Sequence, residues 1–137
     1  MRRAAKNDKR ITVQRETAQW VSLQMPPPIS TNELFIAFNK GGKSVRVRSF
    51  KYQKWSREAL AMIEEQNPAR VEGPFGLRIL LSNKCRMDIS NTIKAYEDAL
   101  VQAGICDDDR YCQRIEVAKV SDQNTTIQVT AVREVKS

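Results

Sequence analysis

The chain has 137 residues, 41% of them hydrophobic and 28% charged, and this balance predicts one compact, soluble domain. Lysine and arginine outnumber aspartate and glutamate by 23 to 16, which gives a formal net charge of +7. The sequence contains no histidine, and this absence excludes Ser-His-Asp triads, Cys-His dyads and histidine-bound metal ions. Any catalysis must therefore use carboxylates, lysine or a metal held by oxygen ligands.

The three cysteines, Cys85, Cys106 and Cys112, cannot all pair with one another and form no C-x-x-C motif. We expect reduced, structural thiols, as is usual for intracellular proteins. No apolar run approaches the roughly 18 residues that cross a membrane. Residues 1–15 lack the apolar stretch of a secretory signal. These features predict a cytoplasmic protein with no membrane partner.

The positive charge is concentrated in two blocks of the sequence. Residues 1–15 contain six basic residues and one acid, and residues 40–57 contain seven basic residues and no acid. This distribution indicates a surface that binds a polyanion rather than a uniformly charged exterior. Since residues 1–15 also show no apolar periodicity, we expect a basic flexible arm there and a folded domain over residues 16–137.

The first strand is predicted at residues 20–25, where apolar and polar residues alternate, and the three prolines at 26–28 end it. An apolar run of strand length follows at residues 34–38. The glycine-containing turn at 40–43 separates it from an alternating run at 45–48. These two runs and the turn between them predict a β-hairpin.

Arg46 and Arg48 alternate with valines in the second strand of this hairpin, so we expect buried valines on one face and arginines on the open face. Residues 37–44 also lack only the first glycine of a nucleotide-binding G-x-x-x-x-G-K-S loop. That loop must lead into a helix whose N-terminus faces the phosphates, whereas residues 45–48 have the pattern of a strand. The sequence therefore predicts a basic hairpin and no nucleotide cofactor.

The apolar period changes to that of a helix at residues 50–66, where Trp55 falls on the apolar stripe and is placed in the core rather than in base stacking. Asn67 and Pro68 end this pattern. The rest of the chain predicts an apolar strand, a second helix and two final strands, at residues 75–82, 90–103, 115–120 and 126–132. The fold class is α+β, with one mixed sheet of about five strands backed by two helices.

Acidic residues flank the second predicted helix. Asp88 precedes it, and three aspartates at 107–109 follow it. A helix of roughly 14 residues separates its ends by about 21 Å. The carboxylates can therefore meet only if the chain doubles back after Gly104 and brings residues 105–109 beside the end of strand 75–82. The alternative is that Asp88 simply begins the helix while residues 107–109 form a solvated loop.

A long segment around this helix resembles the signature of the RusA family of Holliday junction resolvases. It reads D-I-S-N-T-I-K-A-Y-E-D-A-L from Asp88 to Leu100, and Gly104 and the acidic run at 107–109 follow. The family shows D-[IL]-D-N, a lysine three residues beyond the asparagine, a D-A-L, a glycine and an acidic pair. The proline turn, the basic loop, the helix with an aromatic residue and the apolar strand also come in the family's order. The resemblance covers roughly residues 20–133.

The resemblance implies a dimeric, Mg²⁺-dependent enzyme of phages and prophages, with Mn²⁺ as a substitute ion, that cuts four-way DNA junctions symmetrically. It implies that Asp88 and Asp109 bind the metal and act in catalysis with Lys94, and that Asp108 is a weaker ligand. A metal polarises the phosphoryl oxygens and activates water, and Lys94 would neutralise charge that develops on the phosphate. The alternative role of Lys94 is an ion pair with Asp98 at i+4.

The chain departs from the family pattern at Ser90, where the family has its second motif aspartate. A hydroxyl cannot supply a carboxylate's charge, although it can bind a metal through a water, and serine also caps helices. Asp107 or Asp108 is a candidate replacement ligand. Three functions stay open: an active junction endonuclease, a junction-binding protein with impaired or lost cleavage, and a generic basic nucleic-acid-binding protein.

The basic residues in and near the second block are expected to contact DNA phosphates, with binding that weakens as salt rises. These candidates are Lys40, Lys43, Arg46, Arg48, Lys51, Lys54, Arg57 and Arg86. The expected partners are thus branched double-stranded DNA and a second copy of the chain.

Overall fold

The structure is a computed structural model that describes residues 12–16, 19–121 and 124–136. Its strands and helices are β1 (Thr12–Glu16), β2 (Val21–Met25), β3 (Phe35–Lys40), β4 (Lys43–Arg48), α1 (Phe50–Gln66), β5 (Phe75–Ser82), α2 (Ile93–Gln102), β6 (Cys112–Ser121) and β7 (Thr125–Lys136). Short 3-10 helices lie at Thr31–Glu33 (η2), Ile89–Asn91 (η3) and Asp109–Tyr111 (η4). The fold class is α+β, as predicted.

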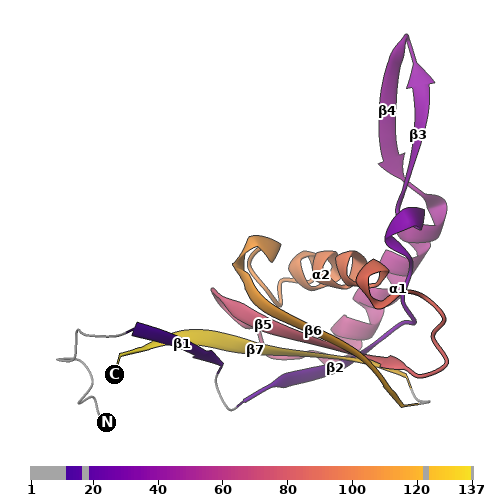
Figure 1. Cartoon of the computed structure of the whole chain (residues 1–137). Coiled ribbons are helices and arrows are strands. Elements are labelled where there is room, and N and C mark those ends of the chain that lie inside the picture. Colours follow the sequence, from indigo (N-terminus) through magenta and orange to yellow (C-terminus); the bar gives the residue numbers. More distant parts are fainter. Residues whose placement is uncertain (1–11, 17–18, 122–123, 137) are drawn as a thin grey trace.

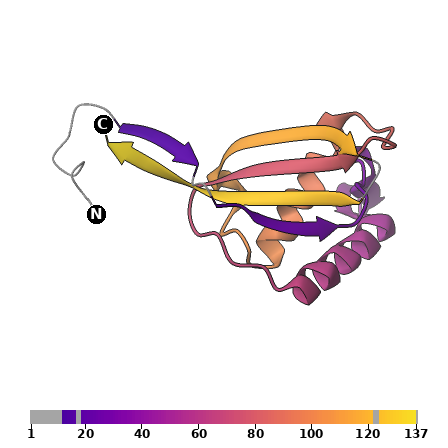
Figure 2. The same cartoon turned by 90° about the horizontal axis from the view of Figure 1, so that it is seen from below.

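The main sheet has five strands, and β7 lies in its interior. β7 pairs antiparallel with β5 on one side, and on the other side with β2 along its first half and with β1 along its last residues. β6 lies beside β5 and is parallel to it, so the sheet is mixed, as predicted. β1 and the end of β7 form a two-stranded ribbon that extends beyond the body of the sheet (Figures 1 and 2).

Both helices pack on one face of this sheet, and Figure 2 shows the opposite face without a covering layer. Alternation along β5 explains this arrangement, because Leu77, Ile79 and Leu81 are buried while Arg78 points to the open face. The helices contribute Tyr52, Trp55, Ala59, Ile63, Ala95, Tyr96, Ala99 and Leu100 to the same core. The core position predicted for Trp55 is thus confirmed.

β3 and β4 form a separate hairpin that projects from the start of α1, away from the sheet (Figure 1). Gly41 and Gly42 make its turn with φ angles of 58° and 79°, which glycine adopts without steric cost. Residues 37–44 are thus strand, turn and strand, and they open no helix. The prediction of buried valines is wrong, because the hairpin stands clear of the core: Val45 is half-buried and Val47 is 37% exposed.

Helix 50–66 and strand 75–82 have the predicted bounds, and two other predictions are corrected. Residues 12–15, assigned to the basic arm, belong to β1, because a ladder with the distant end of β7 stabilises this strand; residues 1–11 lie outside the described part of the chain. The second helix begins as the η3 turn, so Ser90 lies inside a 3-10 helix and does not cap α2.

All three cysteines are free, as predicted, with Cys106 buried and the other two half-buried. Burial raises the pKa of the Cys106 thiol to about 12 and that of Cys112 to about 11, so both thiols are protonated at neutral pH. Within the described ranges, neither helix combines the length and apolar character that a membrane span requires.

Candidate active site

The candidate active site lies on a β-α-β unit formed by β5, α2 and β6. β5 ends at Ser82, and a loop leads from it to Asp88 and η3. α2 runs back across the sheet and ends before Gly104, whose φ of 77° turns the chain sharply. β6 then begins beside Phe75, at the start of β5. Asp88 thus lies in the segment before α2, and the aspartate run lies in the segment after it.

The chain doubles back after α2, and a few contacts fix the turn. The backbone N–H of Val71 donates to the carbonyl of Ile105 (2.8 Å), and the carboxylate of Asp107 accepts from the backbone N–H of Gly73 (2.9 Å). The returning segment therefore lies beside the residues that precede β5. The predicted position beside the end of β5 is wrong, because β6 is parallel to β5 and must start where β5 starts.

Lys94, in the first turn of α2, joins two carboxylates. Its ammonium lies 3.1 Å from Oδ2 of Asp109, on the returning segment, and 3.2 Å from Oδ1 of Asp98, one turn along the helix. The hydrogen bond from Lys94 holds the pKa of Asp109 below its usual range, and the same bond raises the pKa of Lys94. Both groups are therefore charged at neutral pH, and both remain partly exposed to solvent.

A buried tyrosine connects α1 to this cluster. The hydroxyl of Tyr52 donates to Oδ2 of Asp98 (2.7 Å). Burial, and then Asp98, raise the pKa of Tyr52, so its hydroxyl stays a donor at neutral pH. The guanidinium of Arg48 lies 4.6 Å from the centre of the Tyr52 ring. Arg48 also lines a cavity of about 220 Å³ together with Asp98, Asp108 and Asp109, so the hairpin reaches the site through this arginine.

The three consecutive aspartates have three different partners. Asp107 pairs with Arg70 and secures the fold-back, so its predicted role as a replacement ligand is not supported by its position. Asp108 accepts from the backbone N–H of Arg110 (3.0 Å) and begins η4 while still lining the cavity. Asp109 is the member of the run that contacts the helix lysine. The acidic run is thus an ordered turn in which each aspartate has a defined partner, rather than a uniformly solvated loop.

Asp88 and Ser90 precede α2, at the end of the helix that carries Lys94, and both are exposed. The Asp88 side chain makes no capping hydrogen bond. Among the residues that the structure describes, no three acidic or cysteine side chains are gathered as metal ligands. The donor chemistry still suits Mg²⁺, which binds through one or two carboxylates, several waters and the substrate phosphates. Asp88, which is exposed, and Asp109, which is partly exposed, are oxygen donors of this kind.

Glu97 is a further acid close to the cluster. Its side chain is half-buried on α2, and burial, followed by the negative charge of Asp109, raises the pKa of Glu97. A carboxyl with a raised pKa beside one with a lowered pKa is an arrangement that recurs at functional sites.

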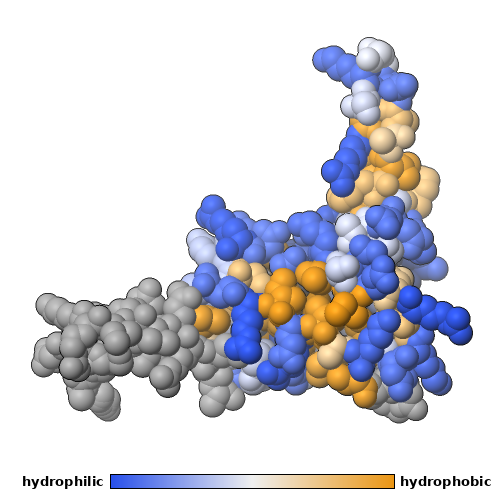
Figure 3. Space-filling model, viewed as in Figure 1, coloured by the Kyte–Doolittle hydropathy of each residue, from blue (hydrophilic) through white to orange (hydrophobic). Residues whose placement is uncertain are grey.

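The predicted DNA contacts lie on the hairpin, on α1 and in one loop. Lys40 and Lys43 flank the hairpin turn, where Figure 3 shows hydrophilic side chains at the tip. Arg46 stacks on the ring of Phe35 (4.2 Å to its centre) and lies two residues from Arg48 on the same face of the hairpin. The remaining candidates, all exposed, are Lys51, Lys54, Arg57 and Arg86.

Three site residues were not predicted from the sequence. Asp98 is visible there only as the i+4 partner of Lys94, and Glu97 gives no signal. Tyr52 meets Asp98 across 46 residues of sequence, and no local pattern indicates such a contact. The contribution of Arg48 to the site was likewise hidden, because a charge pattern does not specify which other element an arginine faces.

Comparison with known families identifies the chain. The family described as endodeoxyribonuclease RusA matches residues 24–131, well over half of the chain, and this span includes the lysine–aspartate cluster and the fold-back. A search of curated proteins returns no significant match. The chain therefore belongs to the RusA endodeoxyribonuclease family.

Proposed function

We propose that the protein is a divalent-metal-dependent endonuclease that resolves four-way DNA junctions by paired, symmetric nicks. The contact between Lys94 and Asp109 carries this proposal. It joins two residues 15 positions apart, and by the resemblance of the Asp88–Leu100 segment and the acidic run we take them as the motif lysine and the distal acid of the family. A solvated acidic loop would not require this contact, whereas phosphodiester cleavage requires charged groups to converge at one place.

The side chains of the cluster suit a phosphate that gains negative charge during hydrolysis. Lys94 provides an ammonium that Asp98 and Asp109 hold from two sides, and Tyr52 holds Asp98 in turn. A cation restrained in this way needs little reorganisation when charge develops. Arg48 lines the cavity formed with Asp98 and Asp109 and offers a planar guanidinium, which binds phosphate oxygens in pairs.

Asp88 and Asp109 are the proposed metal ligands, with Asp108 as a weaker ligand and Ser90 acting through a water. A bound Mg²⁺ or Mn²⁺ would polarise the phosphoryl oxygens and lower the pKa of the attacking water. Asp109 is suited to this role because the contact with Lys94 lowers its pKa and keeps the carboxylate ionised.

We also propose a homodimer, and the projecting hairpin supports it. The strand register places Ile36 opposite Val47 and Phe38 opposite Val45, so these four side chains share one face. Ile36 is 50% exposed, Phe38 45% and the neighbouring Phe50 85%, and Figure 3 shows this apolar surface along the lower hairpin. Because a lone hairpin is marginally stable and exposed apolar patches mark protein contacts, a second copy is the proposed cover. A two-fold dimer would present two equivalent sites to a symmetric junction.

The exposed lysines and arginines of the hairpin and α1 would supply the counter-charge for DNA, with affinity that falls as salt rises. We place the activity in the cytoplasm, where recombination intermediates form and free cysteines stay reduced.

Ser90 favours a second candidate function, a junction-binding protein of the same fold without cleavage. The hydroxyl lacks the charge of the missing carboxylate. Asp107, one possible replacement, is instead paired with Arg70. Under this alternative the site would keep its DNA contacts and lose metal-dependent turnover.

The test is cleavage of an end-labelled four-way junction with Mg²⁺ or Mn²⁺, beside a linear duplex of the same sequence. The natural protein is compared with Asp88→Asn and Ser90→Asp. Glu65→Gln serves as the matched control, since Glu65 is an exposed carboxylate at the far end of α1 from Tyr52.

Paired nicks that are lost in Asp88→Asn and kept in Glu65→Gln would support the endonuclease. Selective junction binding without nicks, with cutting gained in Ser90→Asp, would support the second candidate. Equal affinity for branched and linear DNA without metal-dependent cutting would overturn both.

A further inference from the structure

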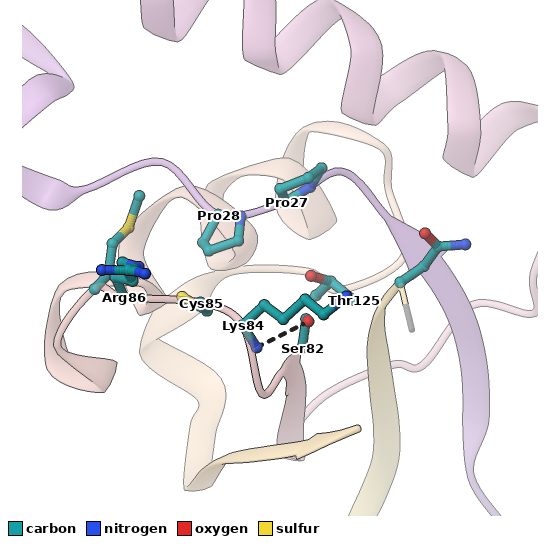
Figure 4. Close-up of a pocket in the computed structure, with 9 residues that line it drawn as sticks. Pro27, Pro28, Ser82, Lys84, Cys85, Arg86 and Thr125 are labelled. Atoms are coloured by element: carbon teal, nitrogen blue, oxygen red, sulfur yellow. Dashed lines mark hydrogen bonds between the residues drawn. The ribbon is translucent and has the colours of Figure 1, made fainter. Parts of the chain in front are cut away.

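A second cavity, of about 580 Å³, lies between the end of β5, the start of β7 and the proline turn after β2 (Figure 4). Its lining shares no residue with the lysine–aspartate cluster. Pro27, Pro28 and Met87 give it apolar surface, and Ser82 and Thr125 give it hydroxyl groups. Its size lies in the range of cavities that hold small organic ligands.

The proline wall of this cavity is fastened to the core. The hydroxyl of Tyr96 donates to the carbonyl of Pro26, and the indole N–H of Trp55 donates to the carbonyl of Pro27, each over 2.6 Å. The two aromatic rings pack edge to face with centres 5.3 Å apart. Because both helices hold the turn, the cavity is formed before a ligand binds, and a ligand does not have to order it.

Basic side chains stand at the cavity. Lys84 and Arg86 both line it and both are exposed, and Figure 4 shows Lys84 extending from the loop after β5 toward Thr125. The loop itself is fixed by a hydrogen bond from the backbone N–H of Lys84 to Oγ of Ser82 (3.1 Å). A ligand that suits this site has a mainly apolar body with a few polar atoms, which would enter the cavity, and a negatively charged group, which would stay at the opening beside Lys84 and Arg86.

The cavity also adjoins the candidate active site along the chain. Met87 lines it, and the next residue, Asp88, is the proposed metal ligand. DNA bound for cleavage at Asp88 would therefore pass the opening of the cavity. A nucleotide matches the chemistry, since its base has flat apolar faces and hydrogen-bonding edges and its phosphate is an anion.

We propose that this cavity takes up an unpaired nucleobase of the bound DNA, with the adjoining phosphates held by Lys84 and Arg86. The inference rests on the proposed function, because it places the base next to the strand that would be cut. The proline rings and Met87 would contact the faces of the base, and Ser82, Thr125 and Asn124 would meet its polar edge.

Cys85 provides a probe in the natural protein, because it lines the cavity and is half-buried. Iodoacetamide labelling of each cysteine is followed by mass spectrometry in EDTA, which prevents cleavage. The protein is saturated with a four-way junction, or with the same junction carrying abasic nucleotides at the branch point. Cys112, outside this cavity, reports any difference in overall shielding between the two DNAs.

We expect the intact junction to slow labelling of Cys85 about fivefold or more relative to the abasic junction, because base stacking favours the occupied cavity several-fold. Cys112 should react equally with both. If both junctions bind and Cys85 is labelled at the same rate on each, the proposal that the cavity holds a base would be overturned, while the proposed endonuclease activity would not be affected. Failure to bind any junction selectively would overturn the endonuclease and this inference together.

A second measurement needs no reactive thiol. With 2-aminopurine at the branch point, binding should raise its emission, because the base leaves its stack. Cys85→Phe, which fills the cavity, should lose this rise and still bind the junction, with affinity lowered by no more than the same several-fold, since the phosphate contacts dominate affinity. An emission rise that survives in Cys85→Phe, or no rise in the natural protein, would contradict the proposal.

Discussion

Tyr52→Phe tests whether the hydroxyl of a buried tyrosine positions Lys94, the proposed catalytic lysine. The substitution removes the 2.7 Å hydrogen bond to Asp98 and leaves the ring, which is 1% exposed, in its packing between Phe35 and Trp55. Asp98 would keep its contact with Lys94 as its remaining partner in the cluster. Lys94 would then be held less firmly through its contact with Asp98.

The magnitude follows from the kind of hydrogen bond that is lost. A hydrogen bond to a charged group contributes about 1.5–3 kcal/mol to stability. The side chain of Asp98 is 21% exposed, so water can replace part of the lost contact. We therefore expect the free energy of unfolding to fall by about 1–2 kcal/mol. Junction cleavage at saturating DNA should fall by up to about tenfold, since tenfold corresponds to about 1.4 kcal/mol.

Urea unfolding and single-turnover cleavage measure the two effects. Tyr111→Phe is the control, because it removes the same hydroxyl from a half-buried tyrosine that contacts Arg110 and not Asp98; its free energy of unfolding should change less than that of Tyr52→Phe. A double-mutant cycle with Asp98→Asn isolates the pair. If Tyr52→Phe unfolds like the natural protein, or if the two substitutions are strictly additive, the proposed support of Lys94 through Asp98 is refuted.

Three further outcomes are expected. Burial and Asp109 raise the pKa of Glu97, so the ionised carboxylate destabilises the folded protein above its ordinary pKa, and protonation removes this cost as pH falls. Glu97→Gln should therefore raise the melting temperature at pH 7 and lose that advantage near pH 4. A difference in melting temperature that stays the same across this pH range would contradict the shift. Arg46→Gln should weaken junction binding and reduce the slope of log K against log salt by about 1, whereas an unaltered slope would remove Arg46 from the phosphate contacts. Phe38→Asp should convert the proposed dimer into a folded monomer in light scattering, with a melting temperature that no longer rises with protein concentration, because Phe38 lies on the exposed apolar face; a persistent dimer would place the interface elsewhere.

The sequence alone predicted the elements whose boundaries depend on neighbouring residues. Helix 50–66 has the predicted bounds, because Ser49 caps its start and Asn67 adopts the left-handed conformation at its end, ahead of Pro68. The hairpin follows from the two glycines of its turn. The motif around Lys94 was recognisable because its spacing lies within one helix and its flanks. All of these signals are local, and residues near in sequence carry them.

Only the tertiary structure decided which distant segments meet. β1 was hidden because its strand partner is the end of β7, more than 100 positions away, and a short polar strand has little pattern of its own. Asp109 reaches Lys94 because the chain folds back beside Val71, and Tyr52 reaches Asp98 because α1 and α2 pack on the same face of the sheet. Such contacts depend on the relative placement of whole elements, which the period and composition of a single segment do not specify.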